Sequence, residues 1–374
     1  MTEKEAYVAF NLTDQVGSVT VQKLVKRFGS VVAAWENYPK KTARNGGEID
    51  WRREFELARK YRVAILTPAD GDYPPMLMKT QGHPLVLYVR GNVAALSKPA
   101  IAIVGTRRAT AYGLDQANKF AHDLAANGWS VVSGLALGID AEAHKGALAA
   151  QGTTVGVIGS ALDCFYPNEN RELAREIVKK GGAVVSEFPF GREPDNQTFP
   201  QRNHVVAALA SGVLAVEAPT KSGTLITLGI AADIGRTVMA VPGRVDSRSS
   251  AGCLKLIRDG ATLVRNAADV KEAMSELLPT VKKAPKVETE KPSSAAKVES
   301  TATPPPAARP GPPPFSIEES LIMHEVDVEG VSMDRLVAKT GLGAAKVATL
   351  CMTLRLKGRV RYLPGNRVAL PRGS

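Results

Sequence analysis

The sequence predicts an α/β protein whose central part is a Rossmann-like, doubly wound parallel sheet, with a small helical domain before it and a winged helix after it. Short apolar runs alternate with amphipathic helical patterns through the middle of the 374-residue chain. This alternation is typical of a parallel sheet that is covered on both faces. Several runs end in glycine-bearing turns that open a helix, as in doubly wound folds. The expected strands are residues 100–104, 130–133, 154–158, 183–186, 213–217, 237–241 and 262–264.

The first 75 residues are expected to form a small helical domain, similar to SAM or helix-hairpin-helix domains. Residues 11–35 and 50–61 have helical patterns, and Gly17 and Gly29 stand at turn positions. The Rossmann-like domain is then assigned to residues 76–278.

The clearest boundary is a stretch rich in Pro, Lys, Ser and Ala over residues 279–314, which predicts a semi-extended linker without a core of its own. Residues 315–374 are expected to form a winged helix. Its predicted elements are helices at 317–325, 333–340 and 344–356, and a hairpin of 359–363 and 367–370 around the turn 364–366.

Composition narrows the location and the class of protein. No run approaches the ~18 to 20 apolar residues of a membrane span, and the N-terminus lacks the order of a signal peptide, so a cytoplasmic protein without membrane contact is expected. Cys164, Cys253 and Cys351 lack any Cys-x-x-Cys spacing, so neither a disulfide framework nor a zinc site is predicted. The net charge is +11, yet residues 96–278 carry 19 Lys+Arg against 18 Asp+Glu. An anion site in this domain must therefore come from the local placement of a few cations.

Four glycine-bearing turns follow predicted strands and carry Ser, Thr or Arg. Glycine allows close approach of a ligand, and the helix N-terminus behind it offers free N–H groups, so the turns together predict a phosphate-lined groove. No G-x-x-x-x-G-K-[ST] or G-x-G-x-x-G pattern occurs among them, which argues against a nucleotide cofactor. The predicted groove residues are Gly105, Thr106, Arg107 and Arg108, Gly134 and Gly138, Gly159 and Ser160, and Ser222, Gly223 and Thr224.

Three cations stand at the same edge: Arg107, Arg202 and Lys221 are expected to contact phosphates. Asp140, in the first turn of a predicted helix, is expected to be exposed, to pair with the helix dipole and to orient Arg107.

Aromatic side chains near these turns are candidates for base stacking. Phe165 and Phe199 are the main ones, and Tyr166 and Phe188 are further ones. Because the chain holds few aromatic residues, core packing is the expected role of at least two of the four.

The motifs taken together resemble the DNA-processing protein A (DprA/Smf) family, over about residues 70–269. The segments that carry the resemblance are 105–113, 133–144, 165–167, 199–203, 217–227 and 241–243. The resemblance implies binding of single-stranded DNA, homodimerisation through the Rossmann-like domain and loading of the RecA recombinase during natural transformation; it also adds Asn203 to the candidate DNA contacts. The chain departs from the family pattern at Thr106, Leu137 and His204, where Ser, a cation and Arg are usual.

Two other classes of function stay open. A phosphoribohydrolase similar to the LOG proteins would need acidic residues after the Ser-Gly-Thr turn, where Leu225 and Ile226 stand instead. A winged-helix transcription regulator is suggested by residues 335–374, which carry 9 Lys+Arg and no Asp or Glu; contact of this domain with double-stranded DNA or with protein is equally open. No His, Asp or Cys cluster suggests catalysis or a metal, so the sequence favours a binding protein without cofactor.

Overall fold

The computed structural model describes residues 1–39, 42–44, 46–275, 317–327, 330–343, 347, 350–351, 354, 359–363 and 367–370. The chain divides into two compact units, Met1–Pro285 and Lys286–Ser374. Within the described residues, no helix is both long enough and apolar enough to span a bilayer.

The chain begins with four helices, α1 (Glu3–Leu12), α2 (Ser18–Phe28), α3 (Val31–Glu36) and α4 (Trp51–Tyr61). The expected turns at Gly17 and Gly29 are present, and Gly29 ends α2 with a φ of 87°. The sequence analysis missed α1, although the reciprocal hydrogen bonds of a capping box between Thr2 and Glu5 mark its start. These helices pack around the fully buried Phe10, whose ring meets Trp35 edge to face at 5.0 Å between centroids.

One sheet forms the centre of the first unit, with the strand order β1-β2-β6-β5-β4-β3-β7-β8-β9. All seven expected strands are confirmed, and they pair with one another in parallel. Their bounds are β3 (Ala100–Val104), β4 (Ser130–Ser133), β5 (Thr154–Val157), β6 (Ala183–Ser186), β7 (Gly212–Ala215), β8 (Thr237–Ala240) and β9 (Thr262–Leu263). Two strands were not predicted from the sequence, β1 (Ala64–Leu66) and β2 (Leu87–Gly91); β2 pairs antiparallel with β6, and β1 pairs antiparallel with β2.

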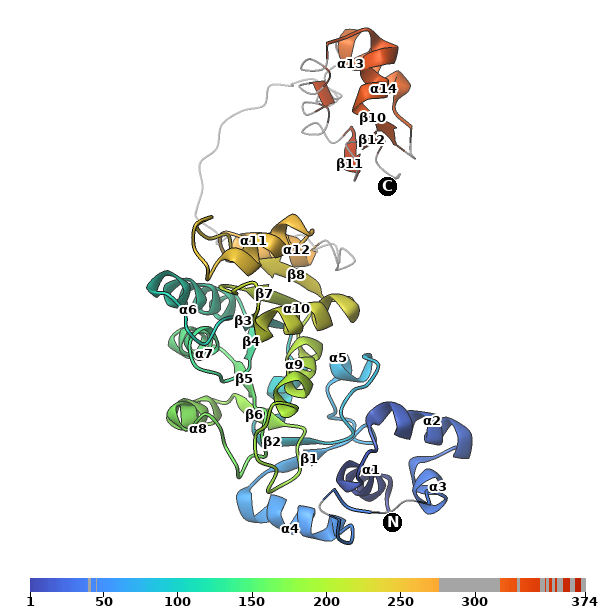
Figure 1. Ribbon diagram of the computed structural model, residues 1–374, viewed down its shortest axis with the longest axis vertical. Helices are drawn as coiled ribbons and strands as arrows, with labels where there is room; N and C mark the ends of the chain where they lie inside the picture. Colours follow the sequence, from blue (N-terminus) through green and yellow to red (C-terminus); the bar gives the residue numbers. More distant parts are fainter. Residues whose placement is uncertain are drawn as a thin grey trace, which may run out of the picture. The chain divides into compact units, whose positions relative to one another are not determined.

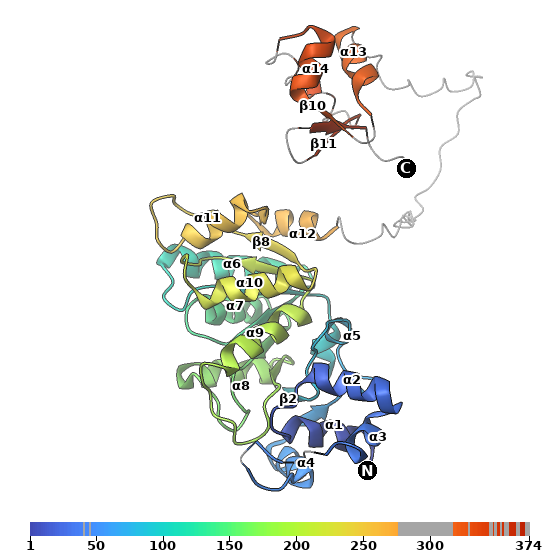
Figure 2. The same cartoon turned by 45° about the vertical axis from the view of Figure 1, so that its right-hand side comes forward.

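Helices cover both faces of this sheet, as Figures 1 and 2 show. On one face lie α6 (Ala111–Ala126), α7 (Ile139–Ala149), α8 (Arg171–Lys179) and α12 (Ala267–Ser275). On the other lie α5 (Pro75–Met78), α9 (Thr198–Leu209), α10 (Gly223–Asp233) and α11 (Ala251–Arg258). Two short 3-10 helices, Val93–Ser97 and Asn168–Asn170, complete the unit.

Strand β3 shows why the strands appear in the sequence as continuous apolar runs. Ala102 and Val104 face the core beneath α9 and α10, whereas Ile101 and Ile103 face the core beneath α6 and α7. All of β3 is buried. Since both faces are covered, no alternation of polar and apolar residues is needed.

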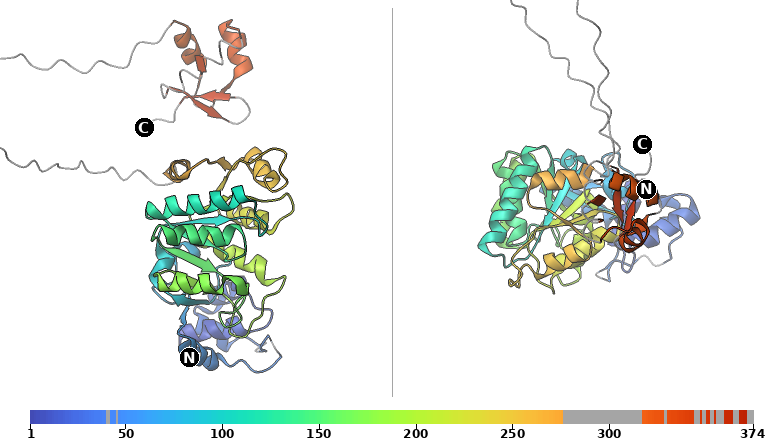
Figure 3. Two further views of the ribbon diagram at one scale, coloured as in Figure 1. Left: turned by 90° about the vertical axis from the view of Figure 1, so that its left-hand side faces the viewer. Right: turned by 90° about the horizontal axis from the view of Figure 1, so that it is seen from above.

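The second unit contains α13 (Ile317–Glu325), β10 (Val331–Ser332), α14 (Met333–Thr340), β11 (Arg361–Leu363) and β12 (Arg367–Ala369). The strands form a small antiparallel sheet in the order β10-β12-β11. Figure 3 shows these strands in red. Its core includes Ile322, Leu336 and Val368. The predicted winged helix is confirmed, with β10 as an element that the sequence analysis missed. The expected linker 279–314, most of the expected helix 344–356 and the expected turn 364–366 lie outside the described residues.

Candidate functional site

A groove of about 400 Å³ lies at the carboxyl ends of the central parallel strands. The chain runs outward from β3 through β4 and β5 to β6, and then returns to place β7 on the other side of β3. Such a switch point opens a crevice at the carboxyl edge, which is where doubly wound sheets bind ligands. Most of the residues predicted from the sequence line it: Gly105, Thr106, Arg107, Arg108, Gly134, Asp140, Phe199, Arg202, Asn203, Lys221, Ser222, Gly223 and Thr224.

The rim of the groove carries exposed cations that lack acidic partners. Arg107, Arg108 and Lys221 are exposed, and none of them forms an ion pair within the described part of the chain. Helix α10 begins at Gly223 in the wall of the same groove, and its first turn has no side-chain cap. Free N–H groups and unpaired cations that face one cavity can bind an anion such as a phosphate.

Arg202 differs from these cations because it forms part of the floor. Its side chain is 5% exposed, and its Nη1 donates to the Val157 carbonyl at 3.0 Å. The same nitrogen lies 4.0 Å from Oδ2 of Asp140, which accepts the Gly134 N–H at 3.0 Å. Burial raises the pKa of Asp140, against the opposing influence of Arg202.

This network corrects the sequence-based picture of Asp140. The carboxylate is buried rather than exposed, and its cationic partner is Arg202 rather than Arg107. A Cβ on Gly134 would lie 1.5 Å from the Arg202 guanidinium, so only glycine leaves room for that side chain. The turn after β4 therefore accommodates the buried arginine as well as opening the groove.

An aromatic wall closes one side of the groove. The ring of Phe199 is half-buried, and the Arg107 guanidinium lies over it at 5.0 Å from the centroid. Tyr166, 44% exposed, lies 6.1 Å from Phe199 between ring centroids. These rings and Gly159 border a smaller hollow that shares Arg107 and Arg202 with the groove. A flat nucleobase could rest on such a surface.

Four of the predicted site and stacking residues line neither the groove nor the smaller hollow. Phe165 turns away from the groove and borders a different pocket beside α8. Ser160 is fully buried, and its carbonyl accepts from the Ser186 hydroxyl at 2.6 Å. Gly138 lies beneath the groove, where a Cβ would come within 2.5 Å of the Thr106 carbonyl oxygen. Phe188, a further stacking candidate, is buried in the core.

Glu217 is a site residue that the sequence analysis missed. It follows β7 and is 1% exposed. Its carboxylate accepts from the Thr110 N–H at 2.9 Å, from the Thr110 hydroxyl at 2.6 Å and from the Ser249 hydroxyl at 3.1 Å. These bonds fix the start of α6 behind the Gly105 turn. A carboxylate at a strand end and a threonine before a helix were the available signals.

His144 is a fully buried, neutral histidine that senses the charge of Arg202. The Thr154 hydroxyl donates to the Val131 carbonyl at 2.7 Å, so its oxygen accepts a hydrogen bond from the Nδ1–H group of His144 at 2.7 Å. Nε2 is buried without a hydrogen-bond partner among the described residues. Burial, and secondarily the charge of Arg202, lowers the pKa of His144 to about 3.

The lowered pKa of His144 predicts that the folded protein loses stability in acid. Below the ordinary histidine pKa of about 6.5 the unfolded chain takes up a proton that the folded chain refuses, so stability falls as the pH drops from about 6.5 towards 3. The expected loss between pH 6.5 and 5 is about 1.6 kcal/mol, measured by urea unfolding. The variant His144→Asn should show a shallower pH dependence in this window. Equal pH dependence of both proteins would contradict the assignment.

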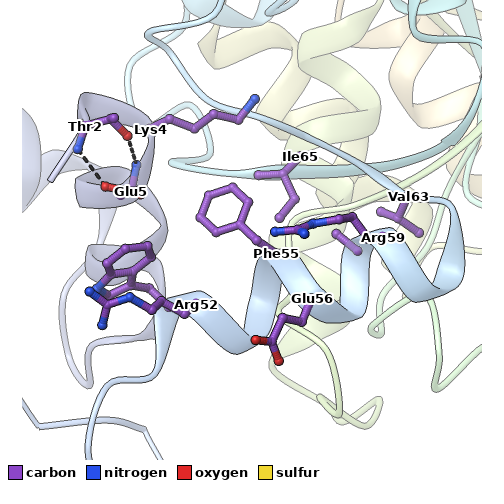
Figure 4. Close-up of a pocket in the computed structure, with 11 residues that line it drawn as sticks. Thr2, Lys4, Glu5, Arg52, Phe55, Glu56, Arg59, Val63 and Ile65 are labelled. Carbon is purple, nitrogen blue, oxygen red and sulfur yellow. Dashed lines mark hydrogen bonds between the residues drawn. The ribbon is translucent and has the colours of Figure 1, made fainter.

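A hollow of about 560 Å³ in the helical N-terminal region offers a weaker site. Figure 4 shows Thr2 and Glu5 bonded to each other at its edge, with Phe55 and Ile65 in its apolar part. Lys4 is paired with Asp70 at 3.0 Å, and Arg52 lies over the Trp51 ring. The polar groups thus serve helix capping and local packing and do not converge on a ligand. Among the described residues, no cluster of His, Cys, Asp and Glu could hold a metal ion.

Known proteins resemble this chain over most of its length. The family pattern of DNA recombination-mediator protein A matches residues 64–275, and that of the DprA winged helix domain matches residues 303–366. Protein Smf of Synechocystis sp. is 31% identical over 400 aligned residues, which cover 98% of this chain and 98% of that protein. DNA processing protein DprA of Bacillus subtilis is 40% identical over 225 residues, or 60% of this chain and 75% of that protein.

Solved structures of two members of this family resemble the chain as well. The X-ray structure of DNA processing protein A from Streptococcus pneumoniae matches with a TM-score of 0.61 and 32% identity, and covers 73% of this chain and 98% of that one. A Helicobacter pylori structure, described for its single-stranded DNA binding mode, matches with a TM-score of 0.52 and 28% identity over 57% of this chain and 96% of that one. The resemblance indicated by the motifs is confirmed: the chain belongs to the DNA recombination-mediator protein A family.

Proposed function

We propose that this chain binds single-stranded DNA in the groove at the carboxyl edge of its sheet. The observation that carries the proposal is the joint placement of Arg107, Arg108 and Lys221, all exposed and unpaired in the described residues, beside the half-buried ring of Phe199. Single strands are held by cations that follow the backbone and by aromatic rings that support the bases. The Helicobacter pylori relative, which is described as binding single-stranded DNA, supports the same assignment.

The wider role in this proposal is that of a recombination mediator, which protects incoming DNA and loads the RecA recombinase onto it during natural transformation. It acts in the cytoplasm as a homodimer. The resemblance of the motifs to the DprA/Smf family supports this role, and the match to the DNA recombination-mediator pattern is compatible with it.

We further propose that the protein is a binder and not a catalyst. Phosphoryl transfer needs a metal-holding carboxylate pair or a P-loop lysine. Asp140 is the carboxylate that lines the groove, and its pairing with buried Arg202 supports a structural role. The apolar Leu225 and Ile226 after the Ser-Gly-Thr turn argue against a phosphoribohydrolase.

A binding titration tests the proposal. Fluorescence anisotropy should give a lower Kd for a single-stranded oligonucleotide than for the same sequence as a duplex, because paired bases cannot reach Phe199. Nucleoside monophosphates should neither compete strongly nor release free base. Tighter binding of the duplex would contradict the proposal and favour the winged helix as the DNA-binding domain. Release of free base would favour a phosphoribohydrolase.

A further inference from the structure

A second pocket, of about 430 Å³, lies away from the groove and carries an excess of positive charge. It is bordered by α8, by the end of β2 and by the loop that holds Phe165. Figure 1 shows α8 and β2 towards the β1 end of the sheet. Four cations and one carboxylate line it. The cations are Arg90, Arg171, Arg175 and Lys179.

The spacing on α8 explains the cluster. Arg171, Arg175 and Lys179 follow one another at intervals of four residues, so they share one face of the helix. Leu173, Ala174 and Ile177 occupy the buried face. The cations thus border the pocket as a consequence of the helix register and without contributing to the core.

Arg90 is a cation of this pocket whose guanidinium has no direct partner. It lies on β2 opposite Val184 and is half-buried. Within the residues that the structure describes, its guanidinium forms neither a hydrogen bond nor an ion pair; burial lowers its pKa, and the charges of Asp163 and Tyr61 oppose this shift. The carboxylate in the pocket, Asp163, accepts the Gly191 N–H at 3.0 Å. A half-buried cation without a partner is unfavourable, so a bound anion would stabilise it.

The remaining walls are flat and apolar. Tyr61 and Phe165 contribute rings, and Leu162, Val178 and Val184 contribute aliphatic side chains. The Arg171 guanidinium lies 5.9 Å from the Phe165 ring centroid. An anionic group beside a planar ring is the chemistry of a nucleoside phosphate, and it matches these walls better than a free inorganic anion.

The chain connects this pocket with the groove. Phe165 borders the pocket, and its neighbour Tyr166 borders the aromatic wall of the groove. Two successive residues thus contribute one ring each, Phe165 to the pocket and Tyr166 to the groove wall. We propose that this pocket is a second nucleotide site, which takes one nucleoside phosphate of a DNA strand that leaves the groove past Tyr166. That the nucleotide belongs to a DNA strand rests on the proposed function. That the pocket takes a nucleoside phosphate does not.

The test uses the full chain with a graded series of oligothymidylates and with thymidine 5′-monophosphate. Arg90→Gln should weaken binding of long oligothymidylates about tenfold, the loss expected for one charge-assisted phosphate contact, and leave the shortest ones that bind unchanged. Arg171→Gln, at an exposed position, should act in the same direction without affecting the fold. Arg53→Gln, exposed on α4 and outside the pocket, is the matched control and should have no effect.

The outcomes separate the two proposals. If Arg90→Gln instead abolishes binding of thymidine 5′-monophosphate and leaves all oligothymidylates unaffected, the nucleotide site is supported with a free nucleotide as its ligand. If Arg90→Gln and Arg171→Gln change neither ligand while Arg107→Ala still weakens DNA binding, the second site is wrong and the groove stands. If Arg107→Ala has no effect on DNA, the proposed function fails, and the monophosphate titration still decides on the pocket.

Discussion

Replacing Arg202 by methionine is expected to lower the free energy of unfolding by about 3–5 kcal/mol, because the substitution leaves the Asp140 carboxylate buried without its cation. Both side chains are buried, at 5% and 6% exposure. The Val157 carbonyl would lose its donor as well. Urea unfolding monitored by circular dichroism measures the change. DNA binding should be impaired only as a consequence of the damaged floor.

The double variant Asp140→Asn/Arg202→Met is the control for this expectation. Asparagine is neutral and can still accept the Gly134 N–H, so the double variant should recover most of the lost stability. Full stability of Arg202→Met together with weaker DNA binding would contradict the structural role. It would instead restore Arg202 as the direct phosphate contact that the sequence suggested.

The parallel part of the sheet could be predicted because burial on both faces makes each strand a short apolar run, as in β3. Strands β1 and β2 were harder to predict. They join the sheet antiparallel, next to a helical region, and β1 has three residues. Their pairing depends on the packing of the N-terminal helices and not on a local pattern. The capping box that starts α1 was a local signal that could have been used.

The edge of the sheet that holds the groove could also be predicted, because glycine turns at strand ends meet there. Which of the cations are exposed and which are buried could not be predicted. Arg107 and Arg202 are both cations near such turns, yet one lies exposed over Phe199 and the other passes beneath Gly134. That difference arises from the close approach of α9 to the turn after β4. Phe165 and Tyr166 likewise face different pockets, although they are neighbours in sequence.

Arg107 is the residue on which the DNA-binding account depends most. It is exposed, it has no ion pair in the described residues, and its guanidinium already lies over an aromatic ring. Removing it should raise the Kd for single-stranded DNA about tenfold at low salt without changing stability. Arg107→Lys should keep the charge and lose the planar contact with Phe199, so it should bind with intermediate affinity. Arg53→Ala, on the exposed side of α4, serves as the control.

The salt dependence of this affinity tests the central claim most directly. Each lost phosphate contact reduces the slope of log K against log salt concentration by about 0.7 for a single strand. Kd is measured by fluorescence anisotropy over a series of salt concentrations for the unmodified protein, Arg107→Ala and Arg53→Ala. The account predicts a slope about 0.7 shallower for Arg107→Ala and an unchanged slope for Arg53→Ala. Identical affinity and identical slope for Arg107→Ala and the unmodified protein would contradict it, because the strand would then lie outside the groove.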